Sequence, residues 1–196
     1  MPGVLRDSLM TLEAYARARS EFRARVLEHK KPRTVKIGDH LTLLFEDELT
    51  VRYQIQEMLR VERTFEERGI LDELDAYNPL VPDGSNFKAT MMIEYDDVAE
   101  RKTALEQLKG LEDRIYVQVG GRPRVYAIAD EDLVRENETK TSAVHFLRFE
   151  LDSETIAAVK RDTSLALAIG ADHPRYTARV EAVPAETRAS LVHDLV

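Results

Sequence analysis

Four side chains with metal-ligand chemistry stand out in this sequence: Glu57, Glu94, His145 and His173. Carboxylate oxygens and imidazole nitrogens in this combination suit iron, manganese or zinc. The four residues belong to four different predicted elements, so a site built from them leaves no short-range spacing pattern. The hypothesis of a metal site therefore depends on the general link between buried ionisable groups and function.

The alternative is a buried polar network with a purely structural role. Residues 50–63 are rich in charged and amide side chains. An apolar stripe nevertheless recurs there at i, i+4, i+7 and i+8, the spacing of one helix face, and consists of Val51, Ile55, Met58 and Leu59. Gln54, Glu57 and Arg60 lie beside this stripe, where a buried polar group costs stability unless it has a partner. This network is the second interpretation of the same segment.

In the network interpretation, the basic partners for the carboxylates of Glu57 and Glu94 are Arg60 and Arg148. His145 is then a hydrogen-bonded histidine of the sheet, because it lies on the apolar face of a predicted strand.

His173 differs from His145 because it precedes Pro174 in a predicted hairpin turn. We expect His173 to be exposed or at the rim of a cleft, where a histidine can act as a ligand or as a general acid–base group. The alternative is a turn residue whose ring caps a backbone group.

The chain has no cysteine, which excludes disulfides, a cysteine nucleophile, thiolate zinc sites and a cysteine-ligated cluster of its own. None of the five histidines has an acidic residue three positions before it, so the Glu-x-x-His pattern of di-iron bundles is absent. The H-E-x-x-H, G-x-S-x-G, G-x-G-x-x-G and Walker A patterns are absent as well. No familiar catalytic motif therefore identifies a reaction.

The net charge of −8 is unevenly distributed. Residues 1–36 hold nine Lys/Arg against four Asp/Glu, a net charge of +5, so the other 160 residues carry −13. An acidic body disfavours general nucleic-acid binding. The basic segment could contact an acidic partner or the protein's own body, or it could be a solvated helix face. Charges interrupt every apolar run and the first ten residues lack a secretory signal, so we expect a cytoplasmic protein without a membrane span.

Turn and capping residues divide the chain into elements. Strands are predicted as three hairpins and two single segments, at 34–45, 114–129, 165–183, 88–95 and 143–151. Helices are predicted at 12–30, at 47–75 with Gly69 as a candidate break, at 97–109, at 153–161 and after Pro184. The acidic segment 130–139 is predicted as a short helix or a loop.

These elements predict an α+β fold that forms a single domain over residues 1–196. Hairpins outnumber βαβ units, so we expect a largely antiparallel sheet of about six or seven strands, packed by the long central helix and by shorter helices. Residues 1–36 form a basic helical segment that packs on this domain or extends from it.

Long blocks of the sequence resemble a bacterial domain-of-unknown-function family, numbered 3501. The blocks are Phe45-Glu46, TVRYQIQEMLR at 50–60, YNPLVP at 77–82, ATMMIE at 89–94, KTSAVHFLRF at 140–149 and DHPRY at 172–176. The turn Gly38-Asp39 departs from the Gly-Pro of the family, which affects only that turn. The resemblance covers essentially the whole chain. It brings no established activity, but genes of the family tend to lie beside those of rubrerythrin-like proteins and iron–sulfur oxidoreductase subunits. The resemblance therefore implies redox or peroxide defence, with such a protein as the partner.

Three functions stay open at this point. The first is a cytoplasmic accessory protein of a redox or oxidative-stress system that binds a protein partner, with or without a metal. The second is a metal-dependent enzyme that uses Glu57, Glu94 and the histidines. The third is a purely structural interaction module. The sequence leaves the oligomeric state open, with a homodimer among the alternatives.

Overall fold

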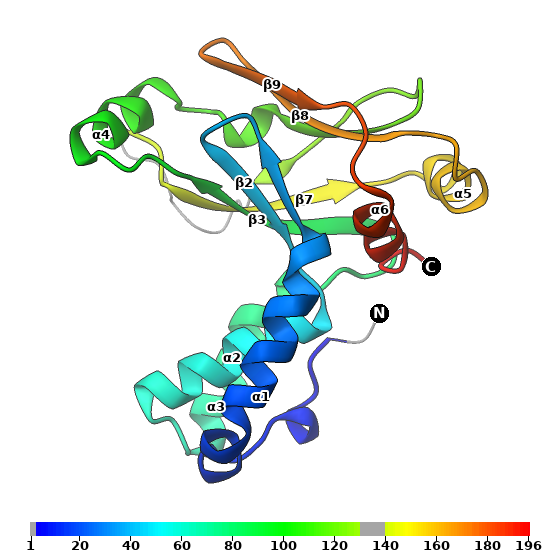
Figure 1. Ribbon diagram of the computed structural model, residues 1–196. Helices are drawn as coiled ribbons and strands as arrows, with labels where there is room; N and C mark the ends of the chain where they lie inside the picture. The colour runs from blue at the N-terminus through cyan, green and yellow to red at the C-terminus, as the bar shows by residue number, and fades with distance from the viewer. Residues whose placement is uncertain (1–2, 130–139) are drawn as a thin grey trace.

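The computed structural model describes residues 3–129 and 140–196 and confirms the α+β class (Figure 1). In these residues the strands are β1 Thr34–Ile37, β2 Leu41–Phe45, β3 Asn86–Ile93, β4 Ile115–Val119, β5 Val125–Tyr126, β6 Ile128–Ala129, β7 Val144–Glu150, β8 Leu167–His173 and β9 Tyr176–Val180. The α-helices are α1 Leu12–Lys30, α2 Glu48–Glu62, α3 Glu67–Tyr77, α4 Val98–Gln107, α5 Ser153–Arg161 and α6 Ala185–Val192. The predicted helix or loop at 130–139 lies outside the described residues. None of the described helices combines the length and apolar character that a bilayer crossing requires.

The strands form two antiparallel sheets rather than the one sheet expected. The first has the order β1-β2-β3-β7-β6 and the second the order β5-β4-β8-β9. Their inner faces share one apolar core, to which β3 contributes Ala89, Met91 and Ile93 by strict alternation. The chain changes sheet at Ala127, because β5 pairs with β4 whereas β6 pairs with β7. The predicted hairpin 114–129 therefore pairs only as far as Tyr126. We call the two sheets together the sandwich.

Tyr176 joins the sheets at one edge of the sandwich. Its hydroxyl donates to the carbonyl of Ile37 at 2.6 Å and accepts from the N–H of His40 at 3.1 Å. Gly38 between them has a φ of +66°, and a Cβ there would lie 2.5 Å from this hydroxyl. The predicted β1–β2 turn is thus confirmed, and glycine is required both by the backbone conformation and by the close approach of Tyr176.

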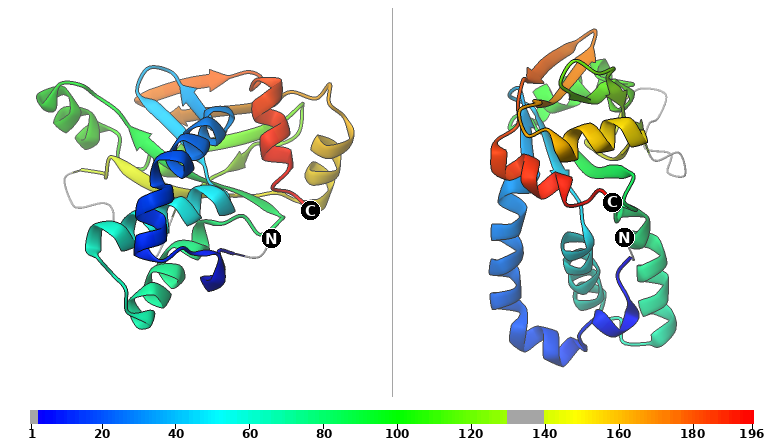
Figure 2. Two further views of the ribbon diagram at one scale, coloured as in Figure 1. Left: turned by 60° about the horizontal axis from the view of Figure 1, so that its bottom comes forward. Right: turned by 90° about the vertical axis from the view of Figure 1, so that its right-hand side faces the viewer.

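The helices α1, α2 and α3 form an arm that projects from the sandwich (Figures 1 and 2). The apolar stripe of α2 packs on α3 and on the N-terminal segment, in a cluster of Val4, Leu9, Val51, Ile55, Leu59, Ile70, Leu74 and Val81. A second cluster lies between α1 and α2, with Tyr15, Phe22 and Val26 buried. The long helix expected to pack on the sheet thus belongs to a helical arm with its own apolar clusters.

The predicted helix over 47–75 is two helices. Asp47 caps α2 with a reciprocal pair of hydrogen bonds: its Oδ1 accepts from the N–H of Thr50 at 3.0 Å, and the Thr50 hydroxyl accepts from the N–H of Asp47 at 2.9 Å. The helix ends at Arg63, which has a φ of 56°. This left-handed position is usually glycine, so the sequence gives no sign of the break. Gly69, the predicted break, lies within α3.

A buried arginine connects the sandwich to the arm and to the C-terminal segment. Arg33 is 1% exposed and donates to the carbonyls of Phe45 and Glu46, each at 2.9 Å. It also donates to Asp194, beyond the end of α6, at 2.5 and 3.2 Å. Asp47 lies 3.4 Å from the Arg33 Nε. One guanidinium therefore fixes the end of β2, the start of α2 and the C-terminal segment.

The two aspartates of this network respond to burial differently. Burial opposes the ionisation of Asp47, but the hydrogen bond from His29 at 2.5 Å and the charge of Arg33 outweigh it, so the Asp47 pKa lies below its ordinary value. Burial raises the pKa of Asp194, although the ion pair with Arg33 opposes that increase.

We predict that Arg33→Met destabilises the protein by about 3–5 kcal/mol, because it leaves a buried carboxylate without its cation. The double variant Arg33→Met/Asp194→Leu should recover much of this loss, since no orphaned charge remains at that position. Urea unfolding at neutral pH measures both values. As a control, replacement of the exposed Arg175 by Met should change the free energy of unfolding by less than about 0.5 kcal/mol. Equal losses in the single and double variants would contradict the prediction.

Candidate functional site

Glu57 lies in the helical arm, where it is held by residues of α1. Its Oε1 accepts from the Tyr15 hydroxyl at 2.6 Å and from Arg19 Nε at 2.7 Å, and its Oε2 accepts from Arg19 at 2.7 Å. Arg60 lies 3.6 Å away. The Arg19 fork, helped by the Tyr15 hydroxyl, lowers the pKa of Glu57 to about 2. Both carboxylate oxygens are thus already engaged in joining α1 to α2.

Glu94 follows β3 and is exposed on the outer face of the first sheet. Its carboxylate accepts from the hydroxyl of Thr42 at 2.5 Å. His145 lies on the opposite, inner face of this sheet, where Met91 is its register partner. The structure therefore places Glu94 and His145 on different sides of one sheet.

Both candidate histidines contact the connection between α4 and β4. His145 is 2% exposed, and its Nε2 lies 2.9 Å from the Thr141 hydroxyl and 4.0 Å from Glu112. His173 was expected to be exposed or at the rim of a cleft, and it is 8% exposed at the end of β8. Its Nε2 donates to the carbonyl of Lys109 at 3.0 Å, and its Nδ1 accepts from the N–H of Arg175 at 3.2 Å. The turn is shorter than predicted, so His173 is a strand residue whose ring fastens a neighbouring loop.

The four proposed metal ligands therefore occupy the arm, the outer sheet face and two places in the sandwich. Within residues 3–129 and 140–196, no three His, Asp or Glu side chains are grouped closely enough to hold a metal ion. The metal site formed by these four residues stays a prediction, and the described geometry does not add support to it.

The predicted polar network is only partly assembled. Arg60 lies near Glu57, but Gln54 is exposed and Arg148 pairs with Glu150 on the outer sheet face. The buried amide of α2 is Gln56, which accepts from the N–H of Met10 at 2.6 Å. The apolar stripe of α2 packs against α3 and the N-terminal segment instead of one sheet, and the amide that this packing buries is that of Gln56, not Gln54.

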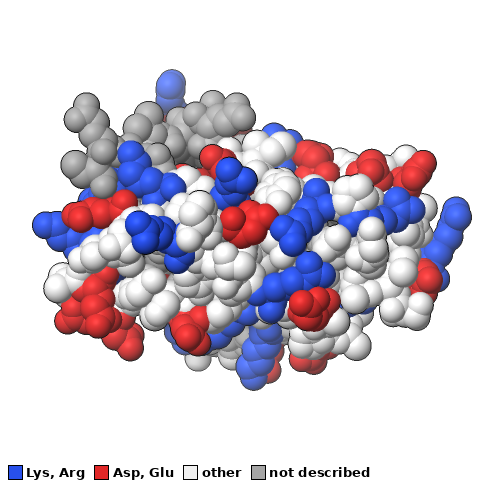
Figure 3. Space-filling view, turned by 90° about the horizontal axis from the view of Figure 1, so that it is seen from above, with Lys and Arg blue, Asp and Glu red and all other residues white. Residues whose placement is uncertain are grey.

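The outer face of the second sheet carries charges of both signs, which Figure 3 shows interspersed over the upper side of the molecule. Arg124 lies 2.7 Å from Asp172, and Arg179 lies 2.7 Å from Glu181. The guanidinium of Arg124 also lies 4.2 Å from the ring centroid of Tyr116. The visible face therefore lacks the uniform positive surface that binds a phosphate backbone.

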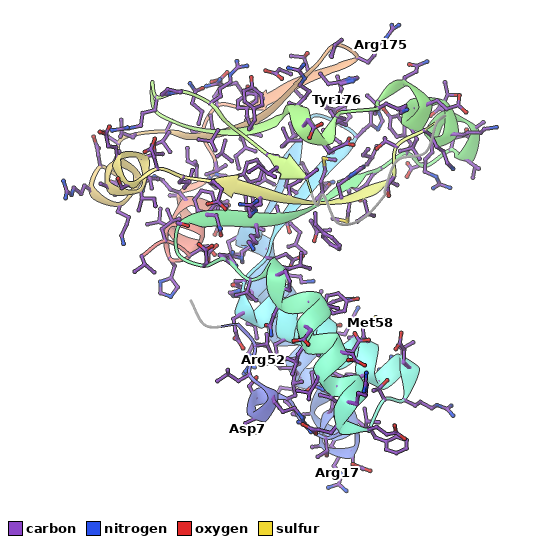
Figure 4. All side chains as sticks on the ribbon, turned by 180° about the vertical axis from the view of Figure 1, so that it is seen from behind. Asp7, Arg17, Arg52, Met58, Arg175 and Tyr176 are labelled. Atoms are coloured by element: carbon purple, nitrogen blue, oxygen red, sulfur yellow. The ribbon has the colours of Figure 1, made fainter. Side chains whose placement is uncertain are left out.

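Two hollows are more promising than the predicted ligand set. The first lies at the distal end of the arm, has a volume of about 330 Å³, and is bordered by Leu9, Leu12, Leu59 and Phe65. Figure 4 places Arg17 at this end of the arm and Met58 on the neighbouring helix. Exposed residues after a helix end, such as Phe65, carry no periodic signal, so sequence patterns did not single out this surface.

The second hollow lies between the outer face of the first sheet and the start of the arm, with a volume of about 250 Å³. Glu46, Thr50 and Thr90 form its polar part. The sequence analysis did not weigh Glu46, although its position directly after a predicted strand and before a helix cap was a usable signal. Gln54, predicted as a network residue, is on the border of this hollow.

The model of the family described as "Protein of unknown function (DUF3501)" matches residues 3–195. The chain belongs to this family. Its fold is similar to that of a crystal structure described as a novel protein of unknown function from Burkholderia pseudomallei K96243, with a TM-score of 0.91 and 55% identity over 100% of both chains. No curated protein matches the chain. These similarities establish the DUF3501 family and the fold, and they name no reaction or ligand.

The ion pair inside the arm of this DUF3501 protein makes its stability depend on pH. The Glu57 pKa is depressed in the folded state, so its contribution is complete above about pH 4.5 and is lost as the pH falls towards 2. Glu57→Gln should cost about 1–3 kcal/mol at pH 7, because Arg19 and Tyr15 lose a charged acceptor. The difference between parent and variant should shrink as the pH falls through that window.

Chemical denaturation between pH 7 and pH 2.5 measures this difference. Glu67→Gln is the matched control, since Glu67 makes a similar fork with Arg6 at an exposed position. It should cost clearly less than Glu57→Gln, because solvent screens an exposed ion pair. A Glu57→Gln cost that stays constant over the whole pH range would contradict the assignment.

Proposed function

We propose that this protein is a cytoplasmic accessory protein of a redox or oxidative-stress system, and that it binds an acidic surface of a protein partner through the distal end of its helical arm. The observation that carries the proposal is Phe65. Its side chain is 75% exposed at the rim of the 330 Å³ hollow. A large aromatic residue beside an apolar hollow is the usual anatomy of a protein-binding surface.

Two further apolar residues flank the connection between α2 and α3 and support this assignment. Val61 is 65% exposed on the last turn of α2, and Leu71 is 45% exposed on α3. Single exposed apolar residues are normal on any protein. Three within eleven consecutive residues, next to a hollow, indicate a surface that a partner covers.

The charges of α1 support an acidic partner. Within the nine basic residues of positions 1–36, the described ion pairs neutralise four, which are Arg6, Arg19, Lys31 and Arg33. Arg17 and Arg23 are exposed on α1, and no carboxylate of the described residues lies within 4.0 Å of either. Opposite charges on a partner would speed association and orient the complex.

The redox part of the proposal rests on the family, whose genes tend to lie beside those of rubrerythrin-like and iron–sulfur proteins. This chain has no cysteine and cannot ligate an iron–sulfur cluster through thiolates of its own. In the proposed complex, the partner therefore carries the cluster, and this protein contributes the docking surface.

The test uses purified proteins: this chain, a rubrerythrin-like protein and an iron–sulfur oxidoreductase subunit, both from the organism that encodes this chain. We expect one of them to bind, as measured by calorimetry. Phe65→Ser should weaken the complex by at least about tenfold, the cost of losing one buried aromatic anchor. Arg17→Glu should weaken it as well and should make the affinity less sensitive to salt.

Val98→Ser is the matched control, because Val98 is 68% exposed on α4, away from the arm. It should leave the affinity unchanged, and all three variants should keep the parent's melting temperature. Absence of binding to both candidates, or equal effects of the Phe65 and Val98 variants, would overturn the proposal.

A further inference from the structure

The 250 Å³ hollow at the base of the arm has one wall made by the sheet and one made by helices. Side chains at matched positions of three adjacent strands form the sheet wall: Leu44, Thr90 and Phe146, whose Cα atoms are paired in register. Tyr77 and Leu80, at and after the end of α3, form part of the opposite wall. The walls are therefore mostly apolar, with partly exposed side chains that a ligand could cover.

The polar part of the hollow is the carboxylate of Glu46, a residue that is 8% exposed. Its Oε2 accepts from the Thr50 hydroxyl at 2.5 Å, and its Oε1 accepts from the Thr90 hydroxyl at 2.6 Å. The backbone is fixed as well, because the Glu46 N–H donates to the carbonyl of Lys88 at 2.8 Å and its carbonyl accepts from Arg33 at 2.9 Å. Glu46 is thus held rigidly with its side chain at the border of the hollow.

Glu46 differs from the buried carboxylates of Asp47 and Asp194 because no cation of the described residues lies beside it. No Lys, Arg or His nitrogen of residues 3–129 and 140–196 lies within 4.0 Å of its carboxylate. Lys30 also borders the hollow, but its ammonium lies 5.5 Å from the ring centroid of Tyr53 instead. A buried carboxylate without a counter-ion is costly. Its four acceptor sites are only half used by the two hydroxyls.

We infer that this hollow binds a small organic cation, a primary amine on an apolar body. The ammonium group donates to the free acceptor sites of Glu46, and the apolar body lies between Phe146 and Tyr77. The volume is below the 300–1,000 Å³ of typical drug-sized pockets, so the ligand is small. An anionic ligand would place its charge against Glu46, and a neutral one would leave this carboxylate without a cation.

Three probes of one shape separate these alternatives: 2-phenylethylamine, 2-phenylethanol and 3-phenylpropionate. The full-length protein should bind the amine at least about tenfold more tightly than the alcohol or the acid. This factor corresponds to the free energy of one charge-assisted hydrogen bond. Ligand-observed NMR and calorimetry measure the affinities. The methyl signals of Leu44 and Val144 should shift with the amine, which locates it in the hollow.

Glu46→Gln should lower the affinity for the amine by at least about tenfold, because it removes the charge and keeps the shape. Glu94→Gln is the matched control. Glu94 lies on the same sheet face and also accepts from a threonine hydroxyl, at 2.5 Å from Thr42, but it is outside the hollow. The Glu94 variant should bind the amine like the parent.

Val144→Trp keeps the inference testable if Glu46→Gln unfolds. Val144 is 37% exposed at the border of the hollow, so the larger ring can occupy that space. This variant should also lose binding. The inference is wrong if the amine fails to bind up to about 10 mM, if the three probes bind equally, or if the folded Glu46 and Val144 variants bind like the parent. None of these results depends on whether the arm binds a partner.

Discussion

The arrangement of this molecule depends on the buried guanidinium of Arg33. A charge at 1% exposure is tolerated only when its donors are satisfied, and here they reach two carbonyls, Ser190 and the carboxylate of Asp194. The two carbonyls lie at the end of β2. Ser190 and Asp194 lie in the C-terminal helix region, 157 and 161 residues after Arg33 in the sequence. The position at which the arm leaves the sandwich is therefore fixed by an interaction between residues that are remote in sequence.

Three consecutive residues that contact Arg33, Phe45 to Asp47, lie in three different environments. Phe45 ends β2 and points into the sandwich core, so strand alternation turns Glu46 to the outer face. Asp47 then caps α2 and receives His29 from the end of α1. Because Arg33 contacts all three residues, the core, the hollow and the arm share one point of attachment. A change at this point would alter the hollow and the direction of the arm together.

Local signals predicted the parts of this fold that depend on local chemistry. The predicted helices at 12–30 and 153–161 and the Gly38 turn are confirmed, because the caps Thr11 and Asp152 and the turn each depend on hydrogen bonds or dihedral angles within a few residues. The helix break was missed because Arg63 adopts a conformation that its side chain does not favour. The division into two sheets was missed because it depends on which distant strand pairs with β6.

In the candidate site, too, local sequence signals did not predict contacts between residues that are distant in sequence. Residue types with ligand chemistry were identifiable, but their partners were not, and partners decide what a side chain can do. Glu57 has the right chemistry for a metal, yet Arg19 and Tyr15 occupy both of its oxygens. His173 was predicted either as an accessible ligand or as a turn residue whose ring caps a backbone group, and both of its ring nitrogens have backbone partners. Lys109 is far from His173 in the sequence, and Tyr15 is far from Glu57, so sequence patterns do not predict either contact.

The buried acids of the described chain differ in one respect that ordinary stability does not explain. Asp47 and Asp194 each have the Arg33 guanidinium within 4.0 Å, so the cost of burying each charge is offset inside the protein. Within the described residues, Glu46 has two hydroxyl donors and no cation within 4.0 Å, although an apolar residue at this position would avoid that cost. A stable core does not require such a group beside a hollow. A ligand that brings its own positive charge would offset the cost, and this makes Glu46, rather than the more conspicuous histidines, the residue that most directly indicates binding.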